Sequence, residues 1–83
     1  MTNNEFDLLD ELYFVQPYSY LKETLGWEDD QLLVTLQSLF EKQYIKCLLE
    51  PDDEVFDQID LKAKGKDLYY LATKKGLMNH NAL

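Results

Sequence analysis

The chain has 83 residues, enough for one domain with a modest core, because a chain of this size buries only about 60% of its unfolded surface. Hydrophobic residues make up 46% of the chain and charged residues 29%, which excludes a disordered chain of low hydrophobicity. No apolar run approaches the roughly 18 residues of a membrane span, and residues 1–5 lack the basic start of a signal peptide. We therefore expect a single domain over residues 1–83, in the cytoplasm and without a membrane partner.

Charge says most about the partners of this chain. Sixteen acidic residues stand against eight lysines, and there is no arginine, so the net charge is -8. Arginine is the side chain that binds guanine edges and phosphates through two hydrogen bonds at once. Residues 1–60 carry fifteen acids and three lysines, net -12, whereas residues 61–83 carry five lysines and one acid, net +4. Net charge and the absence of arginine therefore disfavour DNA as a partner without excluding it.

The first two predicted elements are helices. Apolar residues recur on one face of residues 4–15, which open on Asn4 as the expected cap, so this segment predicts an amphipathic helix. Pro17 ends that helix. A helix of barely two turns is expected over residues 20–25, closed by Gly26 at the position where a left-handed residue ends helices.

The remaining predicted elements are one long helix followed by strands. Three acids open the third helix, where the helix dipole favours negative charge, and Leu32, Leu36, Leu39 and Phe40 form its inward stripe. Pro51 begins a turn between strands. The expected elements are a helix over 28–43, a strand over 44–49, a hairpin or long loop over 55–67, a strand over 67–71 and a short helical turn with a polar tail over 72–83.

Residue patterns at three places resemble those of one known family. They are a Leu-Gly turn (Leu25, Gly26, Trp27), two leucines three apart before an apolar strand start (Leu36, Leu39, then residues 41–45), and a tyrosine, leucine-threonine and glycine pattern in residues 69–76. Over nearly its whole length the chain resembles the winged helix-turn-helix family of transcriptional regulators, departing mildly at Gln43 and Ala72. The resemblance implies a mainly α fold of the α+β class, with a three-helix core, a small β hairpin as the wing and a short C-terminal helix.

The resemblance implies that the third helix would enter the DNA major groove. Gln37 and Ser38 could reach base edges, since glutamine pairs with adenine, whereas Leu33 and Val34 could not. The acids at 28–30 would also repel phosphates at the start of this helix. We therefore favour a helix that contacts another protein, and the candidate partner-binding residues are Trp27, Leu33, Val34, Gln37 and Ser38.

Three lysines carry the alternative. Lys62, Lys64 and Lys66 alternate, so they would share one face of an extended segment at the place where a wing touches phosphates. Lysines on an exposed hairpin also keep its edge from pairing with other chains, and this second explanation stays open.

Catalytic and metal sites find little support in the sequence. His80 is the single histidine and lies near a polar, mobile end, while Cys47 is expected as a small core residue, so neither a Cys-His pair nor a zinc site is apparent. The acids of residues 52–60, Asp57 among them, lack the spacing of a calcium loop. We expect no enzyme, no cofactor and no metal.

Aromatic residues crowd the first third of the chain, at Tyr13, Phe14, Tyr18, Tyr20 and Trp27. They indicate either a partner surface around the first two helices, a homodimer through the first helix and the C-terminal segment, or tyrosines that cover the core with hydroxyls in water. The expected function is a non-enzymatic winged-helix module acting through protein-protein contacts, with itself or another factor, in transcription regulation. The alternative is a transcriptional regulator that binds DNA directly through the third helix and the lysine-bearing wing.

Overall fold

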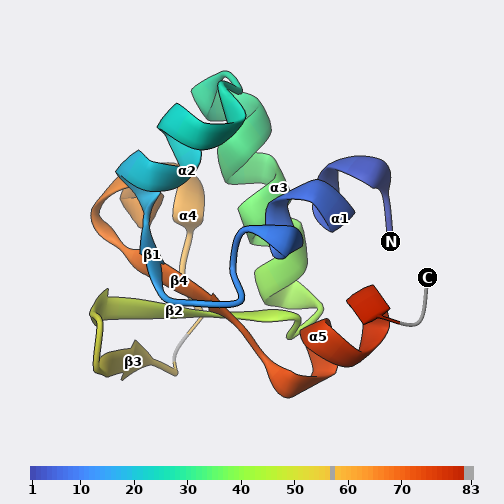
Figure 1. The fold of residues 1–83 in the computed structure, drawn as a ribbon. Coiled ribbons are helices and arrows are strands. Elements are labelled where there is room, and N and C mark those ends of the chain that lie inside the picture. The colour runs from blue at the N-terminus through green and yellow to red at the C-terminus, as the bar shows by residue number, and fades with distance from the viewer. Residues whose placement is uncertain (57, 82–83) are drawn as a thin grey trace.

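The computed structural model describes residues 1–56 and 58–81 (Figure 1). Helices and one antiparallel sheet form an α+β domain, with β2 and β3 below α1, α2 and α3 in this view and α5 at the lower right. In chain order the elements are α1 (Asn3–Asp10), β1 (Gln16–Pro17), α2 (Tyr18–Leu25), α3 (Asp29–Glu41), β2 (Ile45–Glu50), β3 (Asp53–Val55), α4 (Leu61–Lys64), the 3-10 turn η1 (Gly65–Asp67), β4 (Tyr69–Ala72) and α5 (Lys74–Asn81).

The strands form a four-stranded sheet in the order β1-β4-β2-β3. The last strand in sequence, β4, lies between the first two: Tyr70 faces Gln16 of β1 on one side and Cys47 of β2 on the other. Strand β3 pairs with β2 and forms the outer edge. The expected hairpin is therefore part of a larger sheet. Strand β1 was not predicted, because two residues, one of them a proline, carry no alternating pattern.

The core lies between the sheet and the helices and consists mainly of leucine. Three members of the predicted stripe of α3, Leu32, Leu36 and Leu39, are fully buried, and Phe40 packs half-buried against them. Cys47 of β2 is also fully buried, as the sequence predicted. Tyr70 of β4 fills the centre and donates its hydroxyl hydrogen bond to the Gly65 carbonyl oxygen at 2.6 Å.

Helix α1 differs from the prediction at both ends. Its cap is Thr2, not Asn4: the Thr2 hydroxyl accepts from the Glu5 N–H at 3.1 Å, and the Glu5 carboxylate accepts from the Thr2 N–H at 2.9 Å. This reciprocal pair is a capping box. The helix ends at Asp10 because the following residues leave it to join the sheet, where the Leu12 carbonyl oxygen accepts from the Ala72 N–H at 2.8 Å.

Helices α2 and α3 follow the prediction closely. Helix α2 begins two residues earlier than expected, at Tyr18, directly after Pro17. It ends at Gly26, whose φ of 68° is the left-handed conformation that glycine adopts without strain, as predicted. Helix α3 is slightly shorter than expected.

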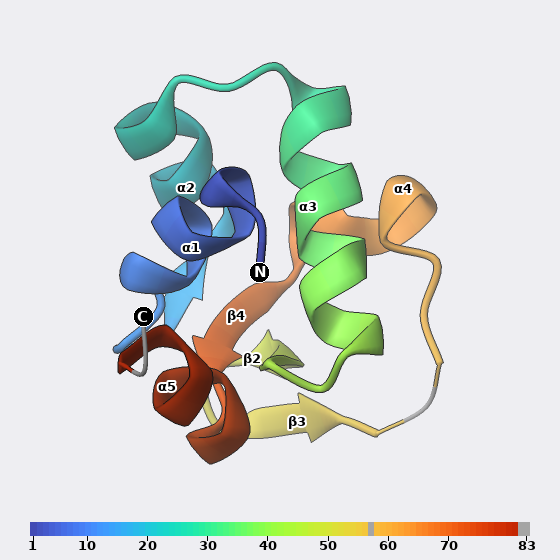
Figure 2. The same ribbon diagram turned by 90° about the vertical axis from the view of Figure 1, so that its right-hand side faces the viewer.

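The segment between β3 and β4 is where the prediction of an extended lysine-bearing wing is wrong. Residues 61–67 form α4 and η1, and the Asp60 carboxylate caps α4 by accepting from the Lys62 N–H at 3.1 Å. Leu61 is fully buried. Helix α4 lies beside α3, and this contact anchors the segment (Figure 2). Because the segment is helical, Lys62, Lys64 and Lys66 do not share one face of an extended strand. Residue 57 of the predicted hairpin or loop lies outside the described residues.

Helix α5 packs against α1 and carries the least expected burial in the molecule. His80 is 7% exposed, not part of a mobile end. Its ring stacks on Phe6 with centroids 4.0 Å apart, and its Nδ1 lies 2.9 Å from the Tyr13 hydroxyl oxygen. The pairing joins residues more than sixty positions apart, which no local pattern indicates. Residues 82 and 83 of the predicted tail lie outside the described residues.

Candidate functional site

The outward side of α3 is acidic and apolar. Asp30, Gln31, Val34 and Glu41 are exposed on it, with 65% of Val34 accessible to solvent. It carries two acids and no lysine among the described residues. Helix α3 therefore presents no charge that attracts a phosphate.

Gln37 and Ser38, the two side chains predicted to reach a base edge or a partner, make hydrogen bonds within the chain. The side-chain oxygen Oε1 of Gln37 accepts from the Leu61 N–H at 2.8 Å. Its side-chain nitrogen Nε2 donates to the Glu41 carboxylate at 3.2 Å. The Ser38 hydroxyl donates to Glu5 at 2.9 Å. Gln37 thus ties α4 to α3, and Ser38 ties α3 to α1.

Glu5 is a buried carboxylate held by three donors. It is 3% exposed and accepts from the Lys42 ammonium at 2.7 Å, as well as from Ser38 and the Thr2 N–H. Burial alone would raise its pKa, but these hydrogen bonds and the charge of Lys42 outweigh burial and lower the pKa to about 2. The side of α3 that faces α1 is therefore occupied by a buried carboxylate whose charge is paired and hydrogen-bonded.

The start of α3 is held by a second carboxylate. Asp29 accepts from the Tyr18 hydroxyl at 2.6 Å and lies 3.5 Å from the Lys22 ammonium and 3.3 Å from the Lys66 ammonium. The Tyr18 hydrogen bond and then the lysines lower its pKa. Lys66, predicted as a phosphate contact, is thus engaged in an ion pair inside the chain.

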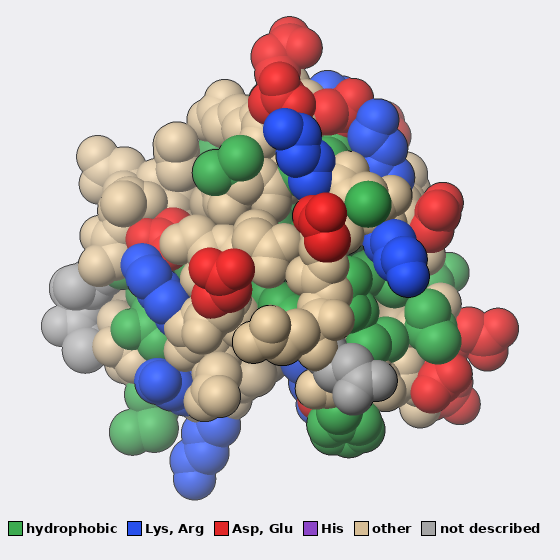
Figure 3. Space-filling view, turned by 180° about the vertical axis from the view of Figure 1, so that it is seen from behind, with side chains coloured by type: hydrophobic (Ala, Val, Ile, Leu, Met, Phe, Trp, Pro, Cys, Tyr) green, Lys and Arg blue, Asp and Glu red, His purple; other side chains and the backbone are tan. Residues whose placement is uncertain are grey.

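Lys62 and Lys64 stay exposed on α4. In the view from behind, lysines and acids are interspersed over the surface and do not form a basic face (Figure 3). The structure therefore brings Lys62 and Lys64 onto one short helix but does not gather the three lysines around a common phosphate site.

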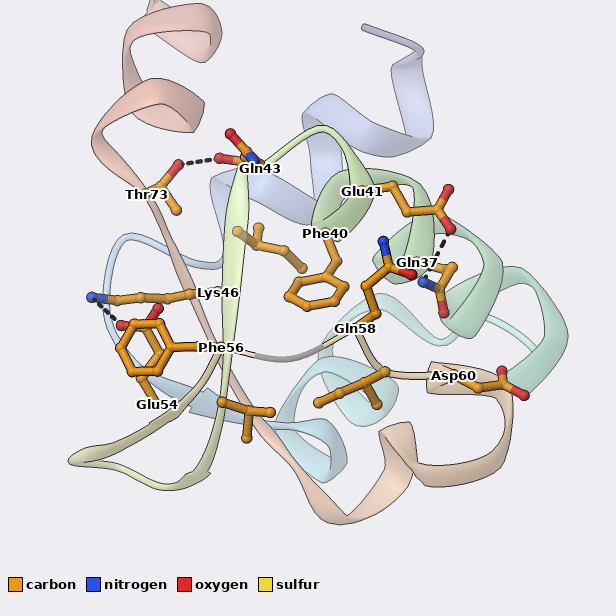
Figure 4. A pocket seen from close by; sticks show the side chains of 13 residues that line it. Gln37, Phe40, Glu41, Gln43, Lys46, Glu54, Phe56, Gln58, Asp60 and Thr73 are labelled. Atoms are coloured by element: carbon orange, nitrogen blue, oxygen red, sulfur yellow. Dashed lines mark hydrogen bonds and ion pairs between the residues drawn. The ribbon is translucent and has the colours of Figure 1, made fainter.

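A groove opens beside the outward side of α3, where Gln37 and Glu41 line it. It lies between the C-terminal half of α3, the start of β2, β3 and residues 58–60 (Figure 4). We call it the α3-β2-β3 groove. Its volume is about 790 Å³. Its apolar lining residues are Phe40, Ile45, Val55, Phe56 and Ile59, and its polar ones are Gln37, Glu41, Gln43, Lys46, Glu54, Gln58, Asp60 and Thr73.

Several groove residues are positioned by contacts that leave the groove open. Gln43 adopts a φ of 64°, and its carbonyl oxygen accepts from the Thr73 hydroxyl at 2.7 Å. Lys46 lies 3.6 Å from Glu54 across the β2-β3 pair. Phe56 projects from the end of β3 with 85% of its surface exposed. Figure 4 shows Phe40 at the centre of the groove and Gln58 pointing toward it.

The predicted partner-binding residues do not form one surface. Leu33 was expected to point outward, and this is wrong: it is 4% exposed, because α4 and η1 cover it where Gly65 approaches its side chain. Trp27 packs half-buried against the core before α3. Val34 is exposed, and only Gln37 lines the groove.

Sequence reasoning missed the other groove residues, because they come from three separate segments. The local signals were Val55, Phe56 and Ile59, which are apolar residues among acids.

The early aromatic residues divide between core and surface. Tyr18 is 5% exposed, whereas Phe14 is 77% exposed. Tyr13 and Tyr20 are about two-fifths exposed and use their hydroxyls within the chain: Tyr13 donates to Asn81 at 2.9 Å and Tyr20 to Glu11 at 3.1 Å. Phe14 is therefore the one of these residues whose ring has no evident structural role.

Cys47 and His80 lie on different elements, in β2 and α5. Burial, and next the nearby Glu54 carboxylate, raise the pKa of the Cys47 thiol to about 12, so it is protonated and a poor nucleophile at neutral pH. Within residues 1–56 and 58–81, no three histidine, cysteine or acidic side chains are placed to hold a metal ion. Among the described residues, Cys47 and His80 therefore form no pair of nucleophile and base.

Comparison with protein-family models, with curated proteins and with solved structures gave no match, so these comparisons assign the chain to no family. In the described part of the chain, no helix combines the length and the apolar character needed to cross a membrane.

Proposed function

We propose that this chain is a non-enzymatic winged-helix module that acts through protein contacts. The order of α1, β1, α2, α3, β2 and β4, with β4 paired between β1 and β2, supports a winged helix into which β3, α4 and η1 are inserted. A role in transcription regulation follows from the family resemblance of the sequence.

The observation that carries the protein-contact function is the outward side of α3. In a winged helix that binds DNA, this helix enters the major groove. Here it presents Asp30 and Glu41, and its candidate base-reading residues Gln37 and Ser38 are hydrogen-bonded to Leu61 and Glu5. Placing these acids against phosphates would cost binding free energy, and the apolar Val34 suits a protein surface better than a base edge.

The alternative function is direct DNA binding through α3 and the segment that bears Lys62 and Lys64. The exposure of these two lysines on α4 favours it. Lys66 contributes less, because it already pairs with Asp29.

Titration of a fluorescein-labelled DNA duplex at about 50 mM and about 200 mM salt, read by anisotropy, separates the two functions. We expect no saturable binding at either salt concentration. Saturable, salt-sensitive binding that is lost in Lys62→Glu/Lys64→Glu and kept in the control Lys74→Glu/Lys75→Glu would overturn the protein-contact function as the sole one. Light scattering of the same samples shows whether the chain contacts itself.

A further inference from the structure

We propose that the α3-β2-β3 groove binds a basic segment of a partner protein that carries an apolar anchor side chain. This inference rests on the proposed function, since it names the site and the chemistry of the protein contact. Three features of the groove support it: an apolar interior, an acidic rim and an exposed aromatic ring at its edge.

The interior of the groove can hold an apolar side chain. Phe40, Ile45 and Ile59 come from α3, β2 and the segment before α4, and they line one continuous space. Phe40 and Ile59 are only half-buried, although both pack against the core. An inserted leucine or aromatic side chain would remove this remaining apolar surface from water, at about 25 cal/mol per Å².

The rim of the groove selects the charge of the partner. Glu41, Glu54 and Asp60 line it against the single cation Lys46, so the described lining carries three negative charges and one positive, net -2. Lys46 is itself paired with Glu54, which leaves Glu41 and Asp60 on the α3 and α4 side. A lysine or arginine beside the anchor would pair with them, whereas an acidic segment would be repelled.

Phe56 indicates a macromolecule as the occupant and not a small ligand. Its ring is 85% exposed at the edge of the groove, beside Glu54 and Lys46 (Figure 4). An exposed aromatic ring beside an open groove extends the contact area for a chain that runs past the groove. The amides of Gln43 and Gln58 line the same space and can both donate to and accept from such a chain.

A second copy of this chain fits the groove less well than a basic partner. Each copy carries a net charge of -8, so two copies repel each other at long range before any local contact forms. A partner segment rich in lysine and arginine is instead attracted by the whole chain and then oriented by the rim.

The test uses a fluorescein-labelled synthetic peptide with Leu and Phe anchors at i and i+4 spacing and with Lys and Arg at the other positions. A second peptide carries Glu in place of every Lys and Arg. Anisotropy titration of the whole chain should give saturable binding of the basic peptide that weakens with salt. The acidic peptide should not bind.

Matched variants locate the binding site. Glu41→Lys/Asp60→Asn changes the charge by +3 at the rim and keeps α4 capped, because asparagine caps helices as well as aspartate does. Its control, Glu23→Lys/Asp7→Asn, makes the same charge change at exposed positions of α2 and α1. We expect about tenfold weaker binding in the rim variant and less than about twofold in the control.

A second pair of variants probes the apolar contact without altering charge. Phe56→Ser should weaken binding several-fold, whereas Phe14→Ser, which removes another largely exposed ring outside the groove, should not. Equal losses within either pair, equal binding of the acidic peptide, or no binding of the basic peptide would overturn the inference. So would self-association abolished by the rim variant, since the occupant would then be a second copy. These outcomes leave the proposed function standing, because only the DNA titration decides against it.

Discussion

The acidic side chains on the two sides of α3 differ in their burial. Toward α1, the Glu5 carboxylate is 3% exposed and its oxygens are taken by Thr2, Ser38 and Lys42. Toward β2 and β3, Glu41 and Asp60 lie at the rim of an open groove, and Phe56, on the opposite side of that groove, is 85% exposed (Figure 4). Acidic side chains lie on both sides of α3, but only the one on the α1 side, Glu5, is enclosed by the fold.

The difference separates stability from recognition. A buried carboxylate must be fully hydrogen-bonded, since an unpaired one would destabilise the fold. An exposed acid such as Glu41 contributes little to folding and stays available to a partner, whereas Asp60 also caps α4. Substitutions on the α1 side should therefore change the free energy of unfolding, whereas substitutions at the groove should change binding.

The largest expected effect on stability tests whether Leu61 anchors α4 against α3. Leu61→Ala removes a fully buried side chain and should lower the free energy of unfolding by about 3 kcal/mol. Ile59→Ala, two residues earlier and half-buried, should cost only about 1 kcal/mol. Urea denaturation followed by circular dichroism measures both. A Leu61 variant as stable as the unmodified chain would show that α4 does not anchor this segment.

The next effect tests the closed side. Glu5→Gln keeps a side chain that can complete the capping box but removes the charge that Lys42 pairs with, and should cost about 2 kcal/mol at neutral pH.

The effect of Glu5→Gln on the free energy of unfolding should depend on pH. Because the pKa of Glu5 falls from 4.5 in the unfolded chain to about 2 in the fold, its stabilisation is complete above about pH 5. It is lost as pH falls toward 2, so the difference between Glu5→Gln and the unmodified chain should narrow over that range. A difference independent of pH would contradict the buried ion pair.

A smaller effect is expected from the other half of the capping box. Thr2→Ala removes the hydroxyl that accepts from the Glu5 N–H and should destabilise the fold by about 1 kcal/mol. Thr2→Ser, which retains the hydroxyl, serves as the control in thermal unfolding. Similar loss in both variants would mean that the methyl group, and not the cap, matters.

The smallest effect on stability is expected at the groove. Phe56→Ser should change the free energy of unfolding by less than about 0.5 kcal/mol, since the ring is 85% exposed. Chemical denaturation of this variant beside Leu61→Ala sharpens the contrast. A loss of unfolding free energy comparable with that of Leu61→Ala would show that Phe56 stabilises the fold. Its exposure would then no longer support contact with a partner.

The sequence predicted well those elements whose signals are local. The leucine stripe of α3 and the left-handed Gly26 depend on spacing and backbone conformation within a few residues, and both were confirmed. The capping box of Thr2 and Glu5 is equally local but was overlooked in favour of Asn4. Likewise, Asp60 before Leu61 is a helix-start signal that the alternating lysines obscured.

Long-range features could not be predicted in this way. The burial of His80 depends on Phe6 and Tyr13 at the other end of the chain. The groove depends on residues from α3, β2, β3 and the segment before α4, which come together only through the tertiary fold. The burial of Leu33 likewise results from the unforeseen helical segment that covers it.

The central position of β4 has a consequence for the order in which the molecule can fold. Within the described sheet, strand β1 at residues 16–17 pairs only with residues 69–70, and residues 45–48 of β2 pair with the other edge of β4. During synthesis, the first two-thirds of the chain can form helices and the β2-β3 pair, but the sheet lacks its middle strand. Closure depends on a contact between distant residues, and such contacts slow folding. Until residues 69–72 pair, the edges of β1 and β2 that face β4 have no partner in the described sheet.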